Sequence, residues 1–124
     1  MGSPKPHHRL QAWQDSMALV RMVYDLTRLF PKEEIYGLTS QLRRAAVSVP
    51  SNLAEGAGRD GPREFARFPG IARGSLSEME TQLLIAADLG YLPPDQGVFL
   101  LLEKVSRLIT GLHRKTGAVA GSEQ

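Results

Sequence analysis

The sequence lacks cysteine entirely and holds only 3 histidines, of which His7 and His8 lie in a proline-containing segment near its start. A chain without thiols cannot form disulfides, zinc–thiolate sites or iron–sulfur clusters, and it suits the reducing cytoplasm. Charged residues interrupt every apolar stretch well before the roughly 20 residues that a membrane span requires. We therefore predict a cytoplasmic protein with no cofactor, no bound metal and no membrane partner.

Positive charge is missing from the segment 74–103, whose charged residues are Glu78, Glu80, Asp88, Asp95 and Glu103. The preceding segment, 41–73, is rich in arginine and contains Arg43, Arg44, Arg59, Arg63, Arg67 and Arg73. Although the net charge is only +2, this uneven distribution can present a basic face to an anionic partner. The alternative is that the two segments pair with each other inside the fold. The sequence leaves both interpretations open.

Strand-like alternation is absent, and apolar residues recur at helical spacing near 12–30, 36–55, 62–89 and 95–115. Short turns separate these segments, which favours an all-α fold, an antiparallel up-down-up-down four-helix bundle. We predict a flexible N-terminal tail over 1–11, the bundle over 12–115 and a flexible C-terminal tail over 116–124. Pro50 and Pro69 fall inside helical segments, where proline removes a backbone hydrogen bond and predicts a bend.

The same periodicity predicts which side chains form the core. The expected core comprises Trp13, Leu42, Val49, Phe68, Leu76, Leu83, Val105 and Ile109. The first helix carries two adjoining apolar stripes, one through Trp13 and Met17 and one through Leu19 and Val23, which together cover about half of its surface. This is more apolar surface than one bundle needs, so we expect contact with another subunit.

Patterns that would indicate catalysis are missing. The segment Gly56–Gly61 matches G-x-G-x-x-G, but a dinucleotide-binding fingerprint needs a preceding strand, so we interpret it as a turn between helices. Glu78 and Glu80 point to different sides of their helix, and His113 is a lone histidine in the last helical segment. We predict that the protein is not an enzyme.

Small residues form a strip along the third helical segment, at Ala66, Gly70, Gly74, Ser77 and Thr81. Glycine within a helix costs about 1 kcal/mol relative to alanine, so close approach of another helix is the expected compensation. That helix could belong to the same bundle or to another subunit, and the flanking apolar residues favour a subunit. The predicted oligomer interface is Ala66, Gly70, Ile71, Gly74, Ile85 and Leu89.

A resemblance to a known family extends from about Trp13 to Leu112. It is carried by YGLTSQLRRAAVSVPSNLAEG from Tyr36 and by IARGSLSEMETQL from Ile71. The chain resembles the bacterial four-helix-bundle proteins of the 23S rRNA intervening-sequence family, some of which are encoded within insertions in large-subunit ribosomal RNA genes. Members are similar to the accessory variability protein of diversity-generating retroelements, which forms homopentameric rings and binds nucleic acid and a reverse transcriptase. Pro69 departs from the family pattern, which usually has an aliphatic residue there.

The resemblance implies an up-down bundle assembled as a homo-oligomer, with a pentameric ring the favoured form. It also implies a basic surface that includes Arg43, Arg44, Arg59 and Arg73. We add Arg63 and Arg67 to this surface because they belong to the same arginine-rich segment. We therefore predict a nucleic-acid-binding accessory protein, with RNA favoured over DNA, in which these six arginines contact phosphates. The alternative is a structural oligomeric scaffold whose partner is another protein.

Overall fold

The computed structural model describes residues 5–58, 62–93 and 97–122, and the side chains of 62–66 and 116–122 lie outside this description. Two short 3-10 turns and four α-helices make up these residues, which contain no strand. The elements are η1 (Pro6–Arg9), α1 (Gln11–Thr27), η2 (Lys32–Glu34), α2 (Leu38–Ala57), α3 (Pro62–Asp88) and α4 (Gly97–Ser122). The predicted all-α class with four helices is confirmed. None of the helices described combines the length and apolarity that crossing a bilayer would take.

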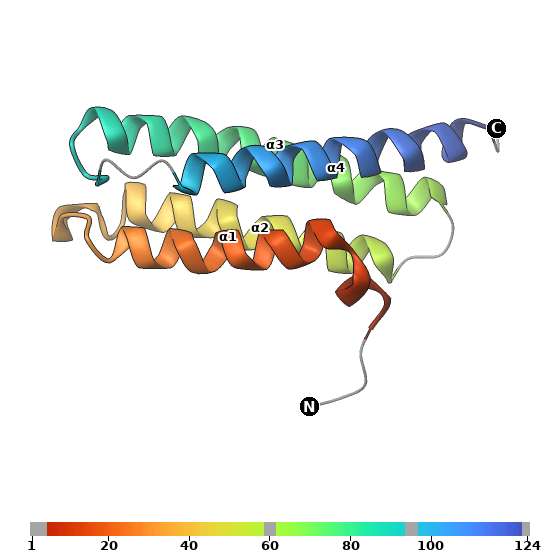
Figure 1. Cartoon of the computed structure of the whole chain (residues 1–124), viewed down its shortest axis with the longest axis horizontal. Helices are drawn as coiled ribbons and strands as arrows, with labels where there is room; N and C mark the ends of the chain where they lie inside the picture. Colours follow the sequence, from red (N-terminus) through yellow and green to blue (C-terminus); the bar gives the residue numbers. More distant parts are fainter. Residues whose placement is uncertain (1–4, 59–61, 94–96, 123–124) are drawn as a thin grey trace.

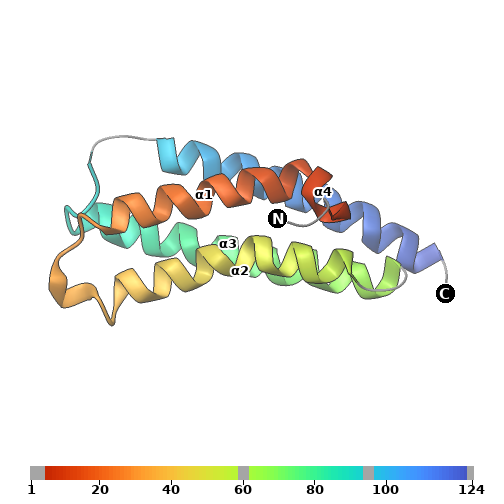
Figure 2. The ribbon, with the colours of Figure 1, turned by 90° about the horizontal axis from the view of Figure 1, so that it is seen from below.

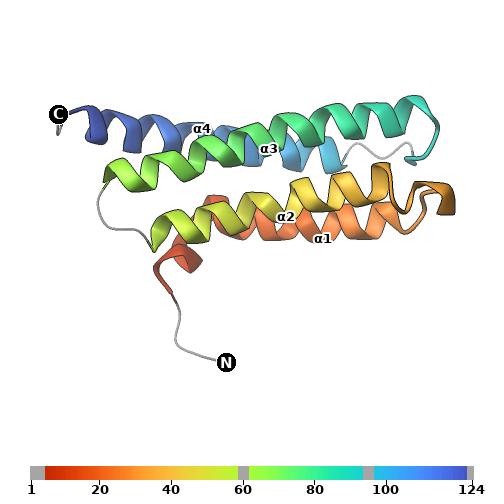
Figure 3. The same cartoon turned by 180° about the vertical axis from the view of Figure 1, so that it is seen from behind.

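The four helices lie side by side in two layers, with α1 and α2 in one layer and α3 and α4 in the other (Figures 1 and 3). Each helix contacts two neighbours, because α1 and α3 both pack against α2 and α4. The last turns of α2 and the first turns of α1 and α3 lie at one end of the molecule (Figure 1). The C-terminal part of α4 extends past α1 at that same end (Figure 2).

Both predicted tails contain more structure than expected. At the N-terminal side, η1 lies against α1, since the Gln14 side chain donates a 2.8 Å hydrogen bond to the His8 carbonyl. The rings of His7 and His8 also contact Trp13, with centroid separations of 5.2 and 4.8 Å. At the other side, α4 continues to Ser122 because the residues after Thr116 include no proline that would end a helix.

The core is continuous and consists mainly of aliphatic side chains. Of the predicted core residues, Leu42, Val49, Phe68, Leu76, Leu83, Val105 and Ile109 are buried. Trp13 was wrongly predicted to be buried and is only partly covered. The reason is that α1 turns its second stripe, through Leu19 and Val23, toward the core and leaves Met17 44% exposed.

Two polar residues share the buried stripe of α1, and each satisfies its hydroxyl within the helix. Ser16 donates to the Trp13 carbonyl at 2.8 Å, and Thr27 donates to the Val23 carbonyl at 2.8 Å. Buried hydroxyls with such partners avoid the cost of an unmade hydrogen bond. The periodicity of apolar residues therefore missed two buried positions. Polar side chains fit there because they form hydrogen bonds to carbonyls of their own helix.

The helices α2 and α3 approach each other closely where α2 ends. A Cβ atom at Gly56 would lie 2.8 Å from the Phe68 Cβ, which is too close for two carbon atoms. Farther along, the hydroxyls of Ser48 and Ser75 are 2.8 Å apart. The first glycine of the G-x-G-x-x-G match therefore serves helix packing, and residues 59–61 of the match lie outside the described residues. Both Pro50 and Pro69 lie within continuous helices and are buried.

The opposite end is fixed by Glu34, which links three elements. Its Oε1 accepts a 3.2 Å hydrogen bond from the Leu38 amide at the start of α2, where a negative charge is favourable. Its Oε2 accepts a 3.0 Å hydrogen bond from the Tyr91 hydroxyl, which follows α3. One carboxylate thus connects η2, the start of α2 and the end of α3.

Replacing Gly56 by alanine should destabilise the fold, because the new methyl group forces α2 and α3 apart. We expect a loss of about 1–3 kcal/mol, the usual cost of overpacking, less the small gain in helix propensity. Gly111 in α4 is the matched control, since nothing lies within 4 Å of its ideal Cβ position. Gly111→Ala should raise stability by about 0.5–1 kcal/mol in the same urea titration. Equal effects of the two substitutions would contradict the close contact.

The Tyr91–Glu34 hydrogen bond should make stability depend on alkaline pH. The bond to Glu34 raises the pKa of Tyr91 above its ordinary 10.0, with desolvation and the charges of Glu34 and Glu33 adding to the effect. Because the folded pKa lies above the unfolded one, the stabilisation is present below about pH 10 and is lost as the pH rises through the raised value. Unfolding midpoints of the wild type and Tyr91→Phe should therefore differ at pH 8 and converge at strongly alkaline pH.

Candidate functional site

The structure describes the side chains of four of the six predicted arginines. Arg43 and Arg44 lie in α2, and Arg67 and Arg73 lie in α3. Arg59 and the side chain of Arg63 lie outside the described residues. The four described side chains have different environments. These environments show which arginines stabilise the fold and which are available to a ligand.

Arg43 is held by the end of α1. Its Nε donates a 2.7 Å hydrogen bond to Thr27 Oγ1, and an Nη2 contact of 3.5 Å reaches the Tyr24 carbonyl. Its guanidinium carbon also lies 4.5 Å from the centre of the Tyr24 ring, a cation–π geometry. A cation at a helix C-terminus is favourable, so Arg43 stabilises the packing of α2 on α1. Its partner is α1 and not the acidic segment 74–103.

Arg44 is exposed and lies beside two grooves. One groove, between α2 and α3, is shared with Glu78, and the other adjoins Tyr24, Ile35 and Val47. No carboxylate of the described residues forms an ion pair with Arg44. The alternative in which the arginine-rich segment pairs with the acidic segment is therefore not found at Arg43 or Arg44 within the described residues.

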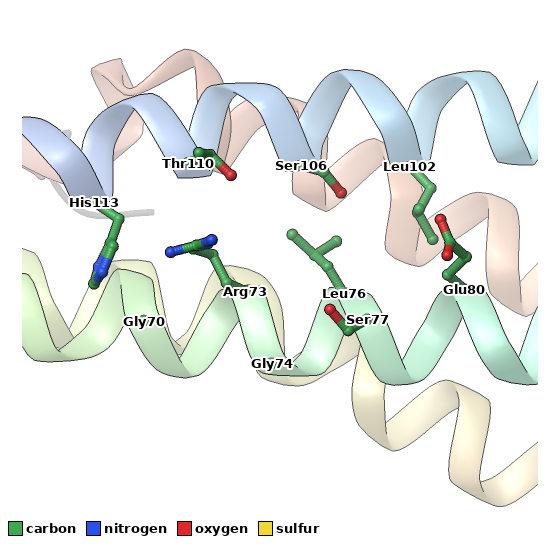
Figure 4. A pocket seen from close by; sticks show the side chains of 10 residues that line it. All are labelled: Gly70, Arg73, Gly74, Leu76, Ser77, Glu80, Leu102, Ser106, Thr110 and His113. Atoms are coloured by element: carbon green, nitrogen blue, oxygen red, sulfur yellow. The ribbon is translucent and has the colours of Figure 1, made fainter.

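A pocket of about 410 Å³ lies between α3 and α4. Arg73, Ser77 and Glu80 line it from α3, and Ser106, Thr110 and His113 line it from α4, with Gly70 and Gly74 along its floor (Figure 4). The guanidinium of Arg73 points toward α4 between His113 and Leu76, whereas Glu80 lies beside Leu102 (Figure 4). No ion pair joins Arg73 to a carboxylate of the described residues. One cation and several hydroxyls thus face an open, polar pocket.

The strip of small residues on α3 adjoins this pocket. Packing of α4 explains why one position of the strip is glycine. A Cβ atom at Gly70 would lie 3.2 Å from His113 Cε1, so this glycine makes room for a side chain of the same molecule. At Gly74 nothing lies within 4 Å of the ideal Cβ position, so the chain itself gives no steric reason for glycine there. The side chain of Ala66 lies outside the described residues.

The three apolar residues of the predicted interface are exposed on α3 and directly after its last residue. Ile71, Ile85 and Leu89 are 42%, 45% and 53% exposed. Each exposed isoleucine or leucine leaves apolar area in water that contact with another molecule would remove. The structure therefore leaves this part of the predicted interface available for contact.

Three cations among the described residues have acidic partners. Arg28 and Asp25 form a 2.7 Å ion pair, and Arg107 and Glu103 form a 3.0 Å pair. Lys104 and Asp15 form a third pair at 3.0 Å, which joins α4 to α1. Arg67, by contrast, lies beside an aromatic ring, with its guanidinium carbon 5.8 Å from the centre of Phe68. Among the residues described, no group of three His, Cys, Asp or Glu side chains is placed to hold a metal ion.

Sequence reasoning missed the contribution of α4 to the pocket. Ser106, Thr110 and His113 recur at spacings of four and three, so one helical face carries all three. That spacing was available in the sequence, but pairing this face with Arg73 requires the packing of α3 on α4. The charge of a single segment could not reveal a site shared between two helices.

The fold and this surface define a class of small, all-helical proteins that carry exposed arginines on the second and third of four helices. The chain belongs to the 23S rRNA-intervening sequence protein family, whose model matches residues 8–111. This match confirms the family resemblance carried by the segments after Tyr36 and Ile71. No curated protein matches the chain.

Replacing Arg43 should destabilise the protein, whereas replacing its neighbour should not. Arg43→Gln removes a charged hydrogen bond and a cation–π contact at a partly buried position, so we expect a loss of about 1–2 kcal/mol. Arg44→Gln changes the same charge at an exposed position and should alter stability by less than about 0.5 kcal/mol. Urea unfolding of both variants measures the difference. Equal stabilities would show that the Thr27–Arg43 bond contributes nothing.

Proposed function

We propose that this protein is a non-enzymatic, oligomeric four-helix bundle that binds nucleic acid, RNA in preference to DNA, through exposed arginines. The observation that carries the proposal is the state of Arg67 and Arg73 on α3. Both are exposed, and neither has a carboxylate of the described residues within ion-pair distance. An unpaired guanidinium on the surface is available to bind a phosphate.

The family description supports RNA as the nucleic acid. It refers to an intervening sequence of 23S ribosomal RNA. The pocket between α3 and α4 offers hydroxyl groups of Ser77, Ser106 and Thr110 beside Arg73. Hydroxyls and arginine are common partners of phosphate and sugar groups. Contacts of this kind position the backbone and carry little sequence information, so we expect binding with weak sequence preference.

Binding should depend on Arg67 and Arg73 more than on arginines that are paired with carboxylates. A short single-stranded RNA should bind the wild type at low salt, with log affinity falling linearly against log salt concentration. Arg67→Gln/Arg73→Gln should weaken binding and flatten that slope by about 0.7 for each phosphate that the protein no longer neutralises. Fluorescence anisotropy of labelled RNA across a salt series measures both quantities.

The matched control is Arg28→Gln/Arg107→Gln. It removes the same charge from two exposed arginines that are paired with Asp25 and Glu103. The control should keep most of the affinity and the slope of the wild type. A wild type that binds no RNA at low salt contradicts the proposal, as does an equal loss of affinity in the two double variants.

The proposed assembly is a ring of up-down-up-down bundles. Similarity to the accessory variability protein of diversity-generating retroelements is what favours five copies, and cyclic symmetry permits a ring. The exposed Ile71 and Ile85 on α3, with Leu89 directly after it, support a contact between copies. Repetition around a ring would also multiply the weak positive charge of one chain.

Assembly should depend on the exposed isoleucines of α3. In sedimentation experiments the wild type should be larger than the 13.6 kDa chain, and Ile71→Ser/Ile85→Ser should shift it toward the monomer. Leu29→Ser/Leu100→Ser is the control, because both leucines are more exposed, at 68% and 65%, and lie outside the predicted interface. A monomeric wild type at micromolar concentration would rule out the ring.

The second candidate function is a structural scaffold for a protein partner. The groove lined by Tyr24, Ile35 and Val47 favours it, because Ile35 is 58% and Val47 is 40% exposed. Retention of a cellular protein after complete nuclease treatment, combined with no RNA binding by the purified chain, would select the scaffold.

A further inference from the structure

The structure separates charge along the axis of the molecule. One end is formed by η1 with the preceding Lys5, the first turns of α1, the last turns of α2, the first two turns of α3 and the C-terminal half of α4 (Figures 1 and 3). Its described side chains include exposed cations from three separate parts of the sequence. These cations are Lys5, Arg9, Arg67, Arg114 and Lys115, which we call the basic end.

Few acidic groups oppose the basic end. Among the described side chains of the segments that form it, the carboxylates are Asp15 and Glu55. Asp15 is already paired with Lys104 of α4. Elsewhere among the described residues, Asp25 pairs with Arg28 and Glu103 pairs with Arg107. Among the described side chains, positive charge is therefore concentrated at the basic end.

Aromatic side chains also gather at the basic end. His7 and His8 of η1 lie 4.4 Å apart between ring centres, and both contact Trp13. Trp13 is only partly buried, and Arg9 follows the two histidines directly. Aromatic rings beside cations are the combination that binds single-stranded nucleic acid, since bases stack on the rings while the cations contact phosphates.

We infer that the basic end, with the ring cluster of His7, His8 and Trp13, is the surface that binds single-stranded RNA. The inference rests on the proposed function and goes beyond it in adding Arg9, Arg114 and Lys115 and in supplying stacking partners. Arg67 is the residue shared by both proposals. Arg114 and Lys115 directly follow His113, whose Cε1 lies 3.2 Å from the ideal Cβ position at Gly70, so this part of α4 lies beside the first turns of α3.

The test compares two triple variants that remove the same charge from the same residue types. Arg9→Gln/Arg114→Gln/Lys115→Gln changes the basic end, and Arg21→Gln/Arg28→Gln/Lys32→Gln changes exposed cations of α1 and η2 nearer the other end. The probe is a short labelled oligouridylate, measured across a salt series. The first variant should bind more than about tenfold more weakly, with a salt slope flatter by about 0.7 for each phosphate left without its cation. The second should bind less than about threefold more weakly, and both should keep the unfolding midpoint of the wild type.

Trp13 supplies a second readout, because it is the single tryptophan of the sequence. Saturating oligouridylate should change its fluorescence in the wild type. A wild type that binds no oligouridylate overturns both the proposed function and this inference. Binding in which the two triple variants are weakened equally, or in which Trp13 emission stays constant at saturation, overturns this inference and leaves the proposed function standing.

Discussion

The close contact between α2 and α3 determines most of the arrangement. Gly56 lets the Phe68 side chain reach the α2 backbone, with 2.8 Å from an ideal Cβ to the Phe68 Cβ, and Ser48 meets Ser75 at 2.8 Å. These two contacts lie at different positions along the helices, so together they fix how α2 and α3 are aligned along their lengths. Because α3 also packs on α4, and α1 on both α2 and α4, this alignment sets which segments share each end of the molecule.

That arrangement creates surfaces that no single segment contains. Packing of His113 over Gly70 brings Ser106 and Thr110 opposite Arg73 and forms the pocket between α3 and α4. The same packing places Arg114 and Lys115, which follow His113, toward the end of the molecule where α3 begins. Some cations form contacts within the fold, as Arg43 does at the end of α1 and Lys104 does with Asp15. Within the described part of the chain, the exposed cations without a carboxylate partner are the ones available to an anionic ligand.

The fold could be predicted from the sequence because helical periodicity and turn residues agree over most of the chain, and Leu42, Leu83 and Ile109 are buried as expected. Periodicity failed at Trp13, since two apolar stripes on α1 were equally regular and only packing decides which one faces the core. It also gave no sign that Arg43 bonds to Thr27, because the two residues are far apart in sequence. The candidate site was predicted as a basic segment, whereas the exposed cations of the basic end come from several segments. Charge partners depend on tertiary contacts, which sequence order does not reveal.

Hydrogen exchange of the wild type with and without single-stranded RNA tests the central claim, that exposed cations and aromatic rings gathered at one end bind the nucleic acid. Backbone amides exchange more slowly where a ligand covers or rigidifies them. Our account predicts added protection in 7–15, in 67–73 and in α4 around Arg114, with little change in η2. Protection confined to η2 and the first turns of α2 and α4 would contradict it.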